Sequence, residues 1–382
     1  MKQTSILFMI ALMFFCVSIA TAAAVPTDKP HVQVVFVLDT TGSMSGLIQA
    51  AKDKIWAIAS TIATADPVPE IEIGLVGYRD RGDEYITKVS DVSPDIDAIY
   101  STLLDFAASG GGDGPESVNQ ALWEAVTKIK WDNDTQTYKT IFLVGDYPPH
   151  MDYKDDVRYP QAAEKAKEKG IIINTIQMGD YHETTPIWKQ IASATGGDFF
   201  QIAQSQIHTH YTTPYDSEIA DLSRKYDSTR VFYGTRDDMA KVEKKAENER
   251  KIYGASKDAE IAQRSIYNMS DAGKSNFTGE NELVDAVASG KVKLDSIPAD
   301  NLPDSMQKLS NEAKEKFIAD KLKERQEYEK QLAALNKKRQ EYIQEEIKKN
   351  AAKEKDSFDS KVFKSLEAQT ADKDMRLGAE VK

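Results

Sequence analysis

The stretch VQVVFVLDTTGSMS, residues 32–45, decides the fold of this protein. Its first seven residues form a nearly continuous valine-rich run, which is typical of a strand buried on both faces of a parallel sheet. Asp39, Thr41 and Ser43 follow at alternate positions. If this loop stays extended, one carboxylate and two hydroxyls face the same point. The stretch therefore predicts a buried strand that delivers oxygen ligands to one edge of a sheet.

The alternation of strand and helix patterns continues as far as residue 202. Strands are predicted at residues 71–76, 86–89, 140–144, 171–176 and 199–202, of which 140–144 is buried and 199–202 is the last edge. Apolar residues at helical spacing occupy the intervals at residues 47–62, 96–106, 118–129, 161–169 and 187–194. This alternation predicts an α/β fold with a doubly wound open sheet, followed by a charged, mostly α-helical C-terminal region. Ligands of such sheets bind in the loops beyond the carboxyl ends of the strands.

Two later loops are also rich in oxygen-bearing side chains. The segment GGGDGPE spans residues 110–116, and GDYPPH spans residues 145–150, directly after a predicted strand. Three acidic loops at one sheet edge would repel one another without a cation between them. Hard cations such as Mg²⁺ take oxygen ligands. The alternative is that Thr41 and Ser43 cap a helix, and that Asp113 and Asp146 are ordinary turn residues.

In strand and helix order over about residues 31–210, the sequence resembles the von Willebrand factor type A domain. The Asp-x-Ser-x-Ser motif of that family's metal-ion-dependent adhesion site appears as Asp39-x-Thr41-x-Ser43, with threonine in the middle position. The second loop lacks the threonine of many A domains. Its Asp113-Gly-Pro-Glu116 is similar to the Asp-x-Pro-Glu found in the A-like domains of integrin β chains. The whole pattern also resembles a group of bacterial secreted proteins.

The resemblance implies one divalent cation, Mg²⁺ or alternatively Mn²⁺ or Ca²⁺, at this edge of the sheet. Its open coordination position would accept an acidic residue of a partner protein. Asp113 is the alternative metal ligand from the second loop. The implied ligands, directly or through water, are Asp39, Thr41, Ser43, Glu116 and Asp146.

Composition and motifs exclude several other classes of function. The 382 residues carry 49 basic and 61 acidic side chains, a net charge of −12, so a general nucleic-acid binder is not expected. Cys16 is the single cysteine, which rules out a disulfide scaffold. GSMSG at residues 42–46 places methionine where a nucleophile elbow has serine, and the second loop lacks the ending of a P-loop. We therefore expect a binding protein and no catalytic residues.

Two weaker motifs leave alternatives open. Arg81-Gly82-Asp83 is an integrin ligand in some extracellular proteins, but any acidic turn can contain this triplet by chance. We favour a role for Asp80 or Asp83 near the metal rim or in an ion pair with Arg79 or Arg81. His150 either supports the metal site from behind its ligands or packs within its own loop. His208-x-His210 lacks the cysteine or carboxylate cluster of a zinc site.

Residues 1–24 are typical of a secretory signal peptide. Lys2 precedes an apolar run that ends in small residues, and cleavage is expected near Ala24. The run is shorter than the roughly 20 residues of a membrane-spanning helix, although an uncleaved anchor stays an alternative. We expect a secreted or periplasmic protein without a membrane span after cleavage.

The composition changes in the second part of the chain. Residues 1–240 contain 20 basic and 33 acidic side chains, whereas residues 241–382 contain 29 and 28. The expected organisation is a signal peptide (1–24), an A-type domain (31–226), a helical region (227–369) and a disordered tail (370–382). Within the helical region, long helices are predicted at residues 239–268 and about 310–350, the second interrupted in its heptad pattern by Arg325 and Arg339.

Two functions follow from these expectations. The first is a metal-dependent protein-binding module in which the A-type domain binds the partner, while the tail is a spacer, a self-association contact or a second docking surface. The second is an envelope structural or assembly factor that binds through its helical tail and keeps a structural metal. A metal-dependent hydrolase is less favoured.

The first prediction concerns processing. Protein recovered from outside the cytoplasm should begin near Val25, because the small residues 20–24 form the expected cleavage site. N-terminal sequencing measures this directly. Intact residues 1–24 on membrane-bound protein would contradict cleavage and indicate an anchor.

Overall fold

Six strands form one mixed sheet in the computed structural model, which describes residues 29–45, 47–112, 114–202, 212–349, 358–373 and 375–378. The strand order is β3-β2-β1-β4-β5-β6. Only β3 runs antiparallel to its neighbour. The strands are β1 (His31–Asp39), β2 (Glu70–Tyr78), β3 (Thr87–Ser93), β4 (Tyr138–Gly145), β5 (Ile171–Met178) and β6 (Phe199–Ile202). The predicted α/β sheet is confirmed, and we call residues 29–202 the sheet domain.

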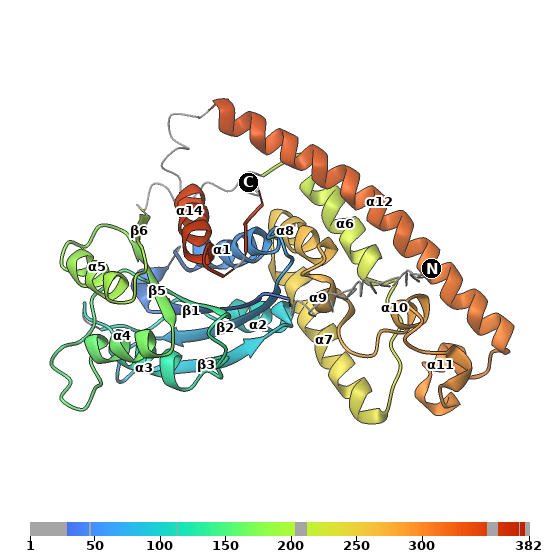
Figure 1. Cartoon of the computed structure of the whole chain (residues 1–382), viewed down its shortest axis with the longest axis horizontal. Coiled ribbons are helices and arrows are strands. Elements are labelled where there is room, and N and C mark those ends of the chain that lie inside the picture. Colours follow the sequence, from blue (N-terminus) through green and yellow to red (C-terminus); the bar gives the residue numbers. More distant parts are fainter. Residues whose placement is uncertain are drawn as a thin grey trace, which may run out of the picture.

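Helices cover both faces of this sheet (Figure 1). Alternate residues of β1 point to opposite faces, so Val34 and Phe36 join one core cluster while Val35 and Val37 join the other. One face is covered by α1 (Leu47–Ile62) and α2 (Ile96–Leu104), the other by α3 (Val118–Thr127), α4 (Tyr159–Glu168) and α5 (Thr184–Ala194). Because β1 lies between two parallel partners, its carboxyl end is held at the middle of one sheet edge.

A helical region, residues 212–349, packs against the sheet domain instead of standing apart from it (Figure 1). Its helices are α6 (Asp216–Asp227), α7 (Arg236–Ala255), α8 (Asp258–Met269), α9 (Lys274–Thr278), α10 (Leu283–Ala288), α11 (Asp304–Gln307) and α12 (Asn311–Lys349). Ile252 of α7 and Ile261 and Tyr267 of α8 belong to the same core cluster as α1 and the strands. The two parts therefore share one continuous core.

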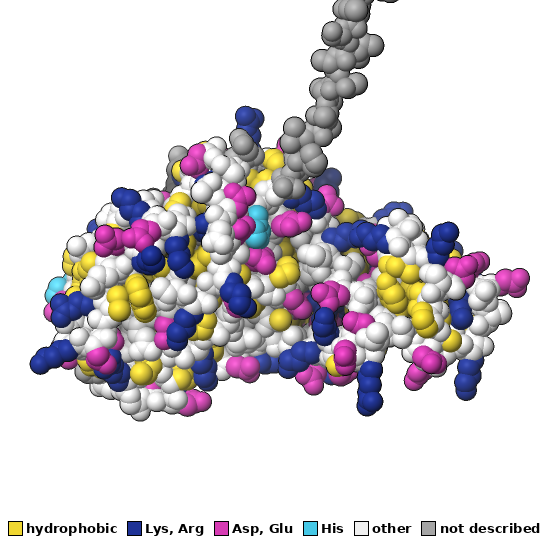
Figure 2. Space-filling view, turned by 60° about the horizontal axis from the view of Figure 1, so that its bottom comes forward, with side chains coloured by type: hydrophobic (Ala, Val, Ile, Leu, Met, Phe, Trp, Pro, Cys, Tyr) yellow, Lys and Arg dark blue, Asp and Glu magenta, His cyan; other side chains and the backbone are white. Residues whose placement is uncertain are grey.

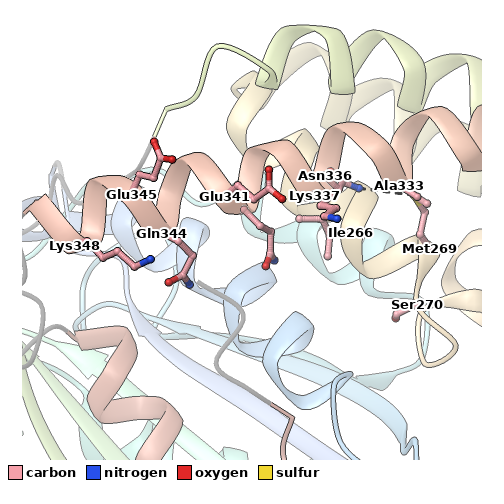
Figure 3. Close-up of a pocket in the computed structure, with 11 residues that line it drawn as sticks. Ile266, Met269, Ser270, Ala333, Asn336, Lys337, Glu341, Gln344, Glu345 and Lys348 are labelled. Carbon is pink, nitrogen blue, oxygen red and sulfur yellow. Dashed lines mark hydrogen bonds between the residues drawn. The ribbon is translucent and has the colours of Figure 1, made fainter.

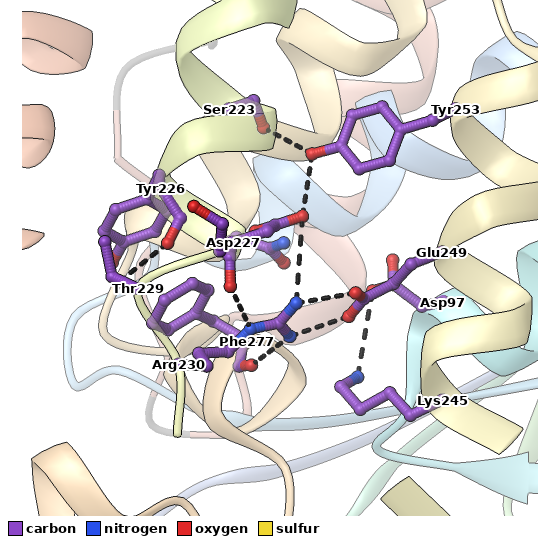
Figure 4. Close-up of polar contacts among 12 residues, drawn as sticks. Asp97, Ser223, Tyr226, Asp227, Thr229, Arg230, Lys245, Glu249, Tyr253 and Phe277 are labelled. Carbon is purple, nitrogen blue, oxygen red and sulfur yellow. Dashed lines mark hydrogen bonds and ion pairs between the residues drawn. The ribbon is translucent and has the colours of Figure 1, made fainter. Parts of the chain in front are cut away.

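A buried ionic network joins α2 of the sheet domain to the helical region (Figure 4). Arg264 is completely buried. Its guanidinium donates a hydrogen bond to each carboxylate oxygen of Asp97, with N···O distances of 2.7 Å. Arg264 also lies 2.9 Å from Asp227 of α6. Arg230 pairs with Glu249 nearby, at 2.6 Å. The paired cations lower the pKa of the Asp97 carboxyl against the opposing effect of its burial.

The long helix α12 packs one stripe against α6, α8 and α10. Its buried residues include Ile318, Arg325, Leu332 and Arg339, at intervals of seven. The two arginines lie inside this stripe because each has a buried partner: Arg325 pairs with Glu282 at 2.8 Å, and Arg339 pairs with Asp216 at 2.8 Å. The arginines that interrupt the apolar pattern are thus part of the packed face.

The last helix, α14 (Phe358–Thr370), returns to the sheet and lies beside β6. Val362 and Leu366 enter the core cluster of the α1 face. Gln369 accepts a hydrogen bond from the Tyr138 hydroxyl (2.7 Å) and exchanges amide hydrogen bonds with Asn174 of β5. Residues 217–226, the end of the expected A-type domain (31–226), lie in α6, which packs on α8 and α12, whereas α14 covers part of the sheet.

Two further expectations about the second part of the chain are wrong. The single helix expected at residues 239–268 is two helices, because Ser256 and Lys257 are extended and α7 and α8 must pack on α2 and α1 in turn. The tail from residue 370 was expected to be disordered, but its described residues pack against the rest of the chain. Met375 and Leu377 are buried, and Arg376 pairs with the backbone of Asp66. The signal peptide expected at residues 1–24 lies outside the described residues.

The surface charges on the face shown in Figure 2 are mixed, with lysine and arginine interspersed among aspartate and glutamate. No helix among the described residues is both long and apolar enough to span a membrane.

The second prediction concerns the buried Arg264. Arg264→Met should lower the free energy of unfolding by about 3–5 kcal/mol, because the Asp97 carboxylate stays buried after its main partner is lost. Arg250→Met is the control, since this exposed arginine pairs only with exposed Glu243 among the described residues and should matter by less than about 1 kcal/mol. Urea unfolding of both variants measures the difference. Equal losses of unfolding free energy in the two variants would show that the Arg264–Asp97 pair does not hold the sheet domain and the helical region together.

Candidate metal centre

Three carboxylates lie at the carboxyl edge of the sheet. Asp39 is the last residue of β1, and Asp146 follows β4, the neighbouring parallel strand. Glu116 precedes α3 and is brought to the same edge by backbone hydrogen bonds with the third loop. Parallel strands end at the same edge, which is why residues far apart in the sequence converge here.

The first loop folds around Asp39. This residue is completely buried, and its Oδ1 atom accepts hydrogen bonds from the backbone N–H of Thr41 (2.8 Å) and from the Thr41 hydroxyl (2.6 Å). The Ser43 hydroxyl lies 3.1 Å from the Thr41 hydroxyl. A short 3-10 turn, Gly42–Met44, makes this approach possible, with Met44 buried beneath it. One carboxylate and two hydroxyls therefore lie together, but a 3-10 turn brings them together and not the extended loop that the sequence suggested.

Glu116 is buried and clamped to the third loop through its backbone. Its N–H donates to the carbonyl of Pro148, and its carbonyl accepts from the N–H of His150; the N···O distance is 3.0 Å in both hydrogen bonds. Asn119, on the helix that follows, donates to the carbonyl of His150. This pairing fixes the side chain of Glu116 toward Asp39 and Thr41. Asp113, the reserve candidate of the second loop, lies outside the described residues.

One oxygen on each of the three carboxylates is buried without a hydrogen-bond partner in the described structure. These atoms are Asp39 Oδ2, Glu116 Oε2 and Asp146 Oδ1. Buried polar atoms are normally paired, so three unpaired oxygens in one place need an explanation. No three His, Cys, Asp or Glu side chains among the described residues meet closely enough to hold an ion by themselves. The hydroxyls of Thr41 and Ser43 complete an oxygen-only donor set.

The electrostatics of the cluster disfavour three negative charges. Burial, together with the charges of Asp39 and Asp80, raises the pKa of Glu116 to about 9. Burial also raises the pKa of Asp39, with Asp146 adding to the effect, and burial raises the pKa of Asp146 itself. A positive charge placed among these carboxylates would restore their ionised forms.

The glycines of the second loop allow it to approach the first. The N–H of Gly42 donates to the carbonyl of Gly110 (3.0 Å), where Gly110 has φ +77°. A β-carbon on Gly110 would lie 2.3 Å from a carboxylate oxygen of Asp83, so the close approach requires glycine. Asp83 accepts a hydrogen bond from the N–H of Gly111 (2.9 Å). Asp83 therefore braces the second loop of the site.

His150 packs under the site through several contacts. Its Nδ1 atom lies 2.8 Å from Asp152, and its ring stacks on Tyr153 with centroids 4.1 Å apart. Its Nε2 atom lies 3.3 Å from Asp80 without hydrogen-bond geometry. Asp80 in turn accepts from the Ser117 hydroxyl (2.8 Å), so it is held beside Glu116. His208 and His210 lie outside the described residues.

Sequence reasoning missed two residues that hold the site together. Arg79 is buried and donates to the carbonyls of Thr40 (3.2 Å) and Ala107 (2.9 Å), which fixes the first and second loops to each other. Tyr78 is buried beneath Asp39, and a β-carbon on Gly145 would lie 2.4 Å from its hydroxyl. The sequence feature that could have identified Arg79 and Tyr78 is their position at the end of the second predicted strand, next to the expected site.

A separate groove of about 710 Å³ lies between α8 and α12, away from this cluster (Figure 3). Ile266, Met269 and Ala333 contribute its apolar wall, and Lys337 and Glu341 lie along α12. Its described lining contains none of the three clustered carboxylates.

Comparisons with known proteins agree with the fold. Residues 33–204 match the family model described as von Willebrand factor A domain. A stretch of 188 residues is 24% identical to a putative ariadne-like RING finger protein of Acanthamoeba polyphaga mimivirus, covering 44% of this chain and 18% of the relative. The chain thus spans about a fifth of that relative's length.

Two solved structures are similar over 47% of this chain, each at 16% identity. One is proximal thread matrix protein 1 from the mussel byssus, matched over 43% of its chain with a TM-score of 0.35. The other is the VWA domain of SpRpn10, matched over 92% of its chain with a TM-score of 0.36.

The third prediction concerns pH. The raised pKa of Glu116 means that its protonated form stabilises the metal-free fold; this contribution is present below its ordinary pKa of 4.5 and is lost as pH rises through about 9. In EDTA, the free energy of unfolding should therefore fall between these pH values, and Glu116→Gln should flatten the slope. Glu70→Gln, at an exposed position on β2, is the control. An unchanged slope in Glu116→Gln would contradict the assignment.

Proposed function

We propose that the von Willebrand factor A domain in this chain is a metal-dependent protein-binding module. Such domains commonly mediate protein–protein interaction. The observation that carries the proposal is the group of three buried, unpaired carboxylate oxygens beside two hydroxyls. An oxygen-only set of this kind suits a hard divalent cation such as Mg²⁺, with Mn²⁺ or Ca²⁺ as alternatives.

Each residue has a defined part in this proposal. Thr41 and Ser43 would hold the ion through their hydroxyls, while Asp39, Glu116 and Asp146 would hold it directly or through water. When bound, the ion supplies a Lewis-acidic position for a carboxylate of the partner. Gly42, Ser43 and residues 110–112 are exposed, so small side chains surround the entrance and leave room for another protein.

The proposal includes the cellular location and the absence of catalysis. Residues 1–24 would direct the chain out of the cytoplasm, where it would act in the periplasm or outside the cell. The three carboxylates would be held ionised by the metal, which leaves no free acid and base pair for hydrolysis.

The second candidate is an assembly factor that binds through its helical region and keeps the metal for structure alone. The groove between α8 and α12 favours this candidate, because it offers an apolar wall beside charged side chains (Figure 3). The two candidates differ in whether capture of a partner requires the ion.

The fourth prediction is that metal binding and partner capture are lost together in Asp39→Ala. Mg²⁺ should raise the melting temperature of the wild type, because a ligand bound only by the folded state stabilises it by about 2.7 kcal/mol at a hundredfold excess over Kd. Asp39→Ala should abolish this rise. Glu116→Gln should weaken metal binding more than Asp113→Asn, since Glu116 faces the cluster. Melting and calorimetric titration measure these effects.

The capture experiment uses the full chain, because the helical region shares the core of the sheet domain. Wild-type protein should retain a partner from envelope extract in Mg²⁺ but not in EDTA, and Asp39→Ala should retain none. Asp155→Ala is the control, since this carboxylate is exposed and pairs with Arg81. Capture that survives both EDTA and Asp39→Ala would favour the helical region as the binding surface. A melting temperature unaffected by Mg²⁺ would contradict the metal site.

A further inference from the structure

A second pocket lies at the opposite edge of the sheet, where β4 and β5 begin. It encloses about 510 Å³ and is lined by the loop at residues 131–135, the end of α4, and the segment that follows α14. Four lysines share this lining: Lys139, Lys167, Lys169 and Lys373. Three of them belong to residues 1–240, where acidic side chains outnumber basic ones.

The acidic residues of the pocket are already paired with other cations. Asp132 lies 2.9 Å from a ring nitrogen of His31, and the contacts of this ring with Glu72 and Asp132 raise the pKa of His31 to about 9. Glu168 pairs with Lys165 at 2.6 Å. Among the described residues, none of the four pocket lysines forms an ion pair with a carboxylate. The lining therefore carries four lysines against two carboxylates, so its charge is positive on balance.

Backbone carbonyls hold three of the lysine amines in place. Lys139 is buried and donates to the carbonyls of Asp132 (2.9 Å) and Asp134 (3.3 Å). Lys169 donates to the carbonyl of Val126 (2.7 Å), and Lys373 to that of Thr135 (2.6 Å). An ammonium group has three donors, so each amine keeps at least one for a ligand. The amines are thus positioned in advance and still able to donate.

The lysines also repel one another in partly dry surroundings. Burial lowers the pKa of Lys139; the charges of Asp132 and Asp134 oppose this effect, and those of Lys373 and Lys169 add to it. Burial likewise lowers the pKa of Lys169. An anion between these amines would relieve both costs, because it restores the interactions that burial removes and offsets the repulsion.

We propose that this pocket binds a small phosphate-bearing ligand. The four lysine amines are cationic N–H donors, which match the oxygens of a phosphate group. The volume lies within the range of about 300–1,000 Å³ that is typical of small-molecule sites, so it admits a phosphorylated small molecule as well as free phosphate. Because Lys373 belongs to the segment after α14, the ligand would also attach that segment to the sheet domain.

The experiment titrates the full chain with inorganic phosphate and, separately, with chloride at equal ionic strength. Phosphate should raise the melting temperature more than chloride does, and phosphorus NMR should show a saturable change in the phosphate signal. Lys169→Ala should weaken phosphate binding about tenfold, which corresponds to about 1.4 kcal/mol. Lys167→Glu should weaken it as well without loosening the fold, because the Lys167 side chain is exposed and makes no hydrogen bond in the described structure.

The control is Lys130→Ala, which removes a positive charge from the neighbouring loop. Lys130 is exposed, pairs with Asp91 at 3.0 Å and does not line the pocket, so phosphate binding should be unchanged. Phosphorylated small molecules in the same assay distinguish free phosphate from a larger ligand. Equal effects of phosphate and chloride would overturn the proposal. Equal losses in Lys130→Ala and Lys169→Ala would also overturn it, since they would indicate unspecific attraction of anions.

Discussion

The burial of three carboxylates at one edge of a parallel sheet is the constraint on which this structure depends. Carboxylates out of contact with water are costly, and neighbouring ones repel each other. The surrounding loops are built to hold them nevertheless: the N–H and hydroxyl of Thr41 bond to Asp39, Arg79 joins two loops, and the backbone of Glu116 is clamped to Pro148 and His150. These contacts hold the carboxylates together at the edge of the sheet.

The sheet and most of this edge could be predicted from the sequence because both depend on local patterns. Apolar runs mark buried strands, and residues placed directly after parallel strands must converge. The position of Glu116 beside Asp39 and Thr41 follows from that rule together with a family resemblance. Arg79 and Tyr78 were missed because their roles depend on which loops they touch, and a sequence read along one strand does not contain that information.

The helical region was harder to predict for a physical reason. Arg325 and Arg339 interrupt an apolar stripe, and only the positions of Glu282 and Asp216 on other helices make their burial favourable. The break between α7 and α8 likewise follows from the need to pack on two different helices. Glu260 of α8 accepts hydrogen bonds from Gln49 of α1 and Tyr100 of α2. Since α1 begins just after the first loop of the site, the helical region supports the scaffold of the site as well as its own core.

The return of α14 to the sheet has a consequence for how the chain is made. A protein is synthesised from its N-terminus, and domains generally fold as units during this process. Here the helix that covers part of the sheet is encoded more than 150 residues after β6, on the far side of the whole helical region. The sheet face beside β6 therefore stays uncovered on the ribosome until α14 has been translated. A nascent chain of this kind completes the core of its sheet domain only after the helical region has emerged. A stop codon upstream of α14 would therefore leave an exposed apolar surface for chaperones and proteases to recognise.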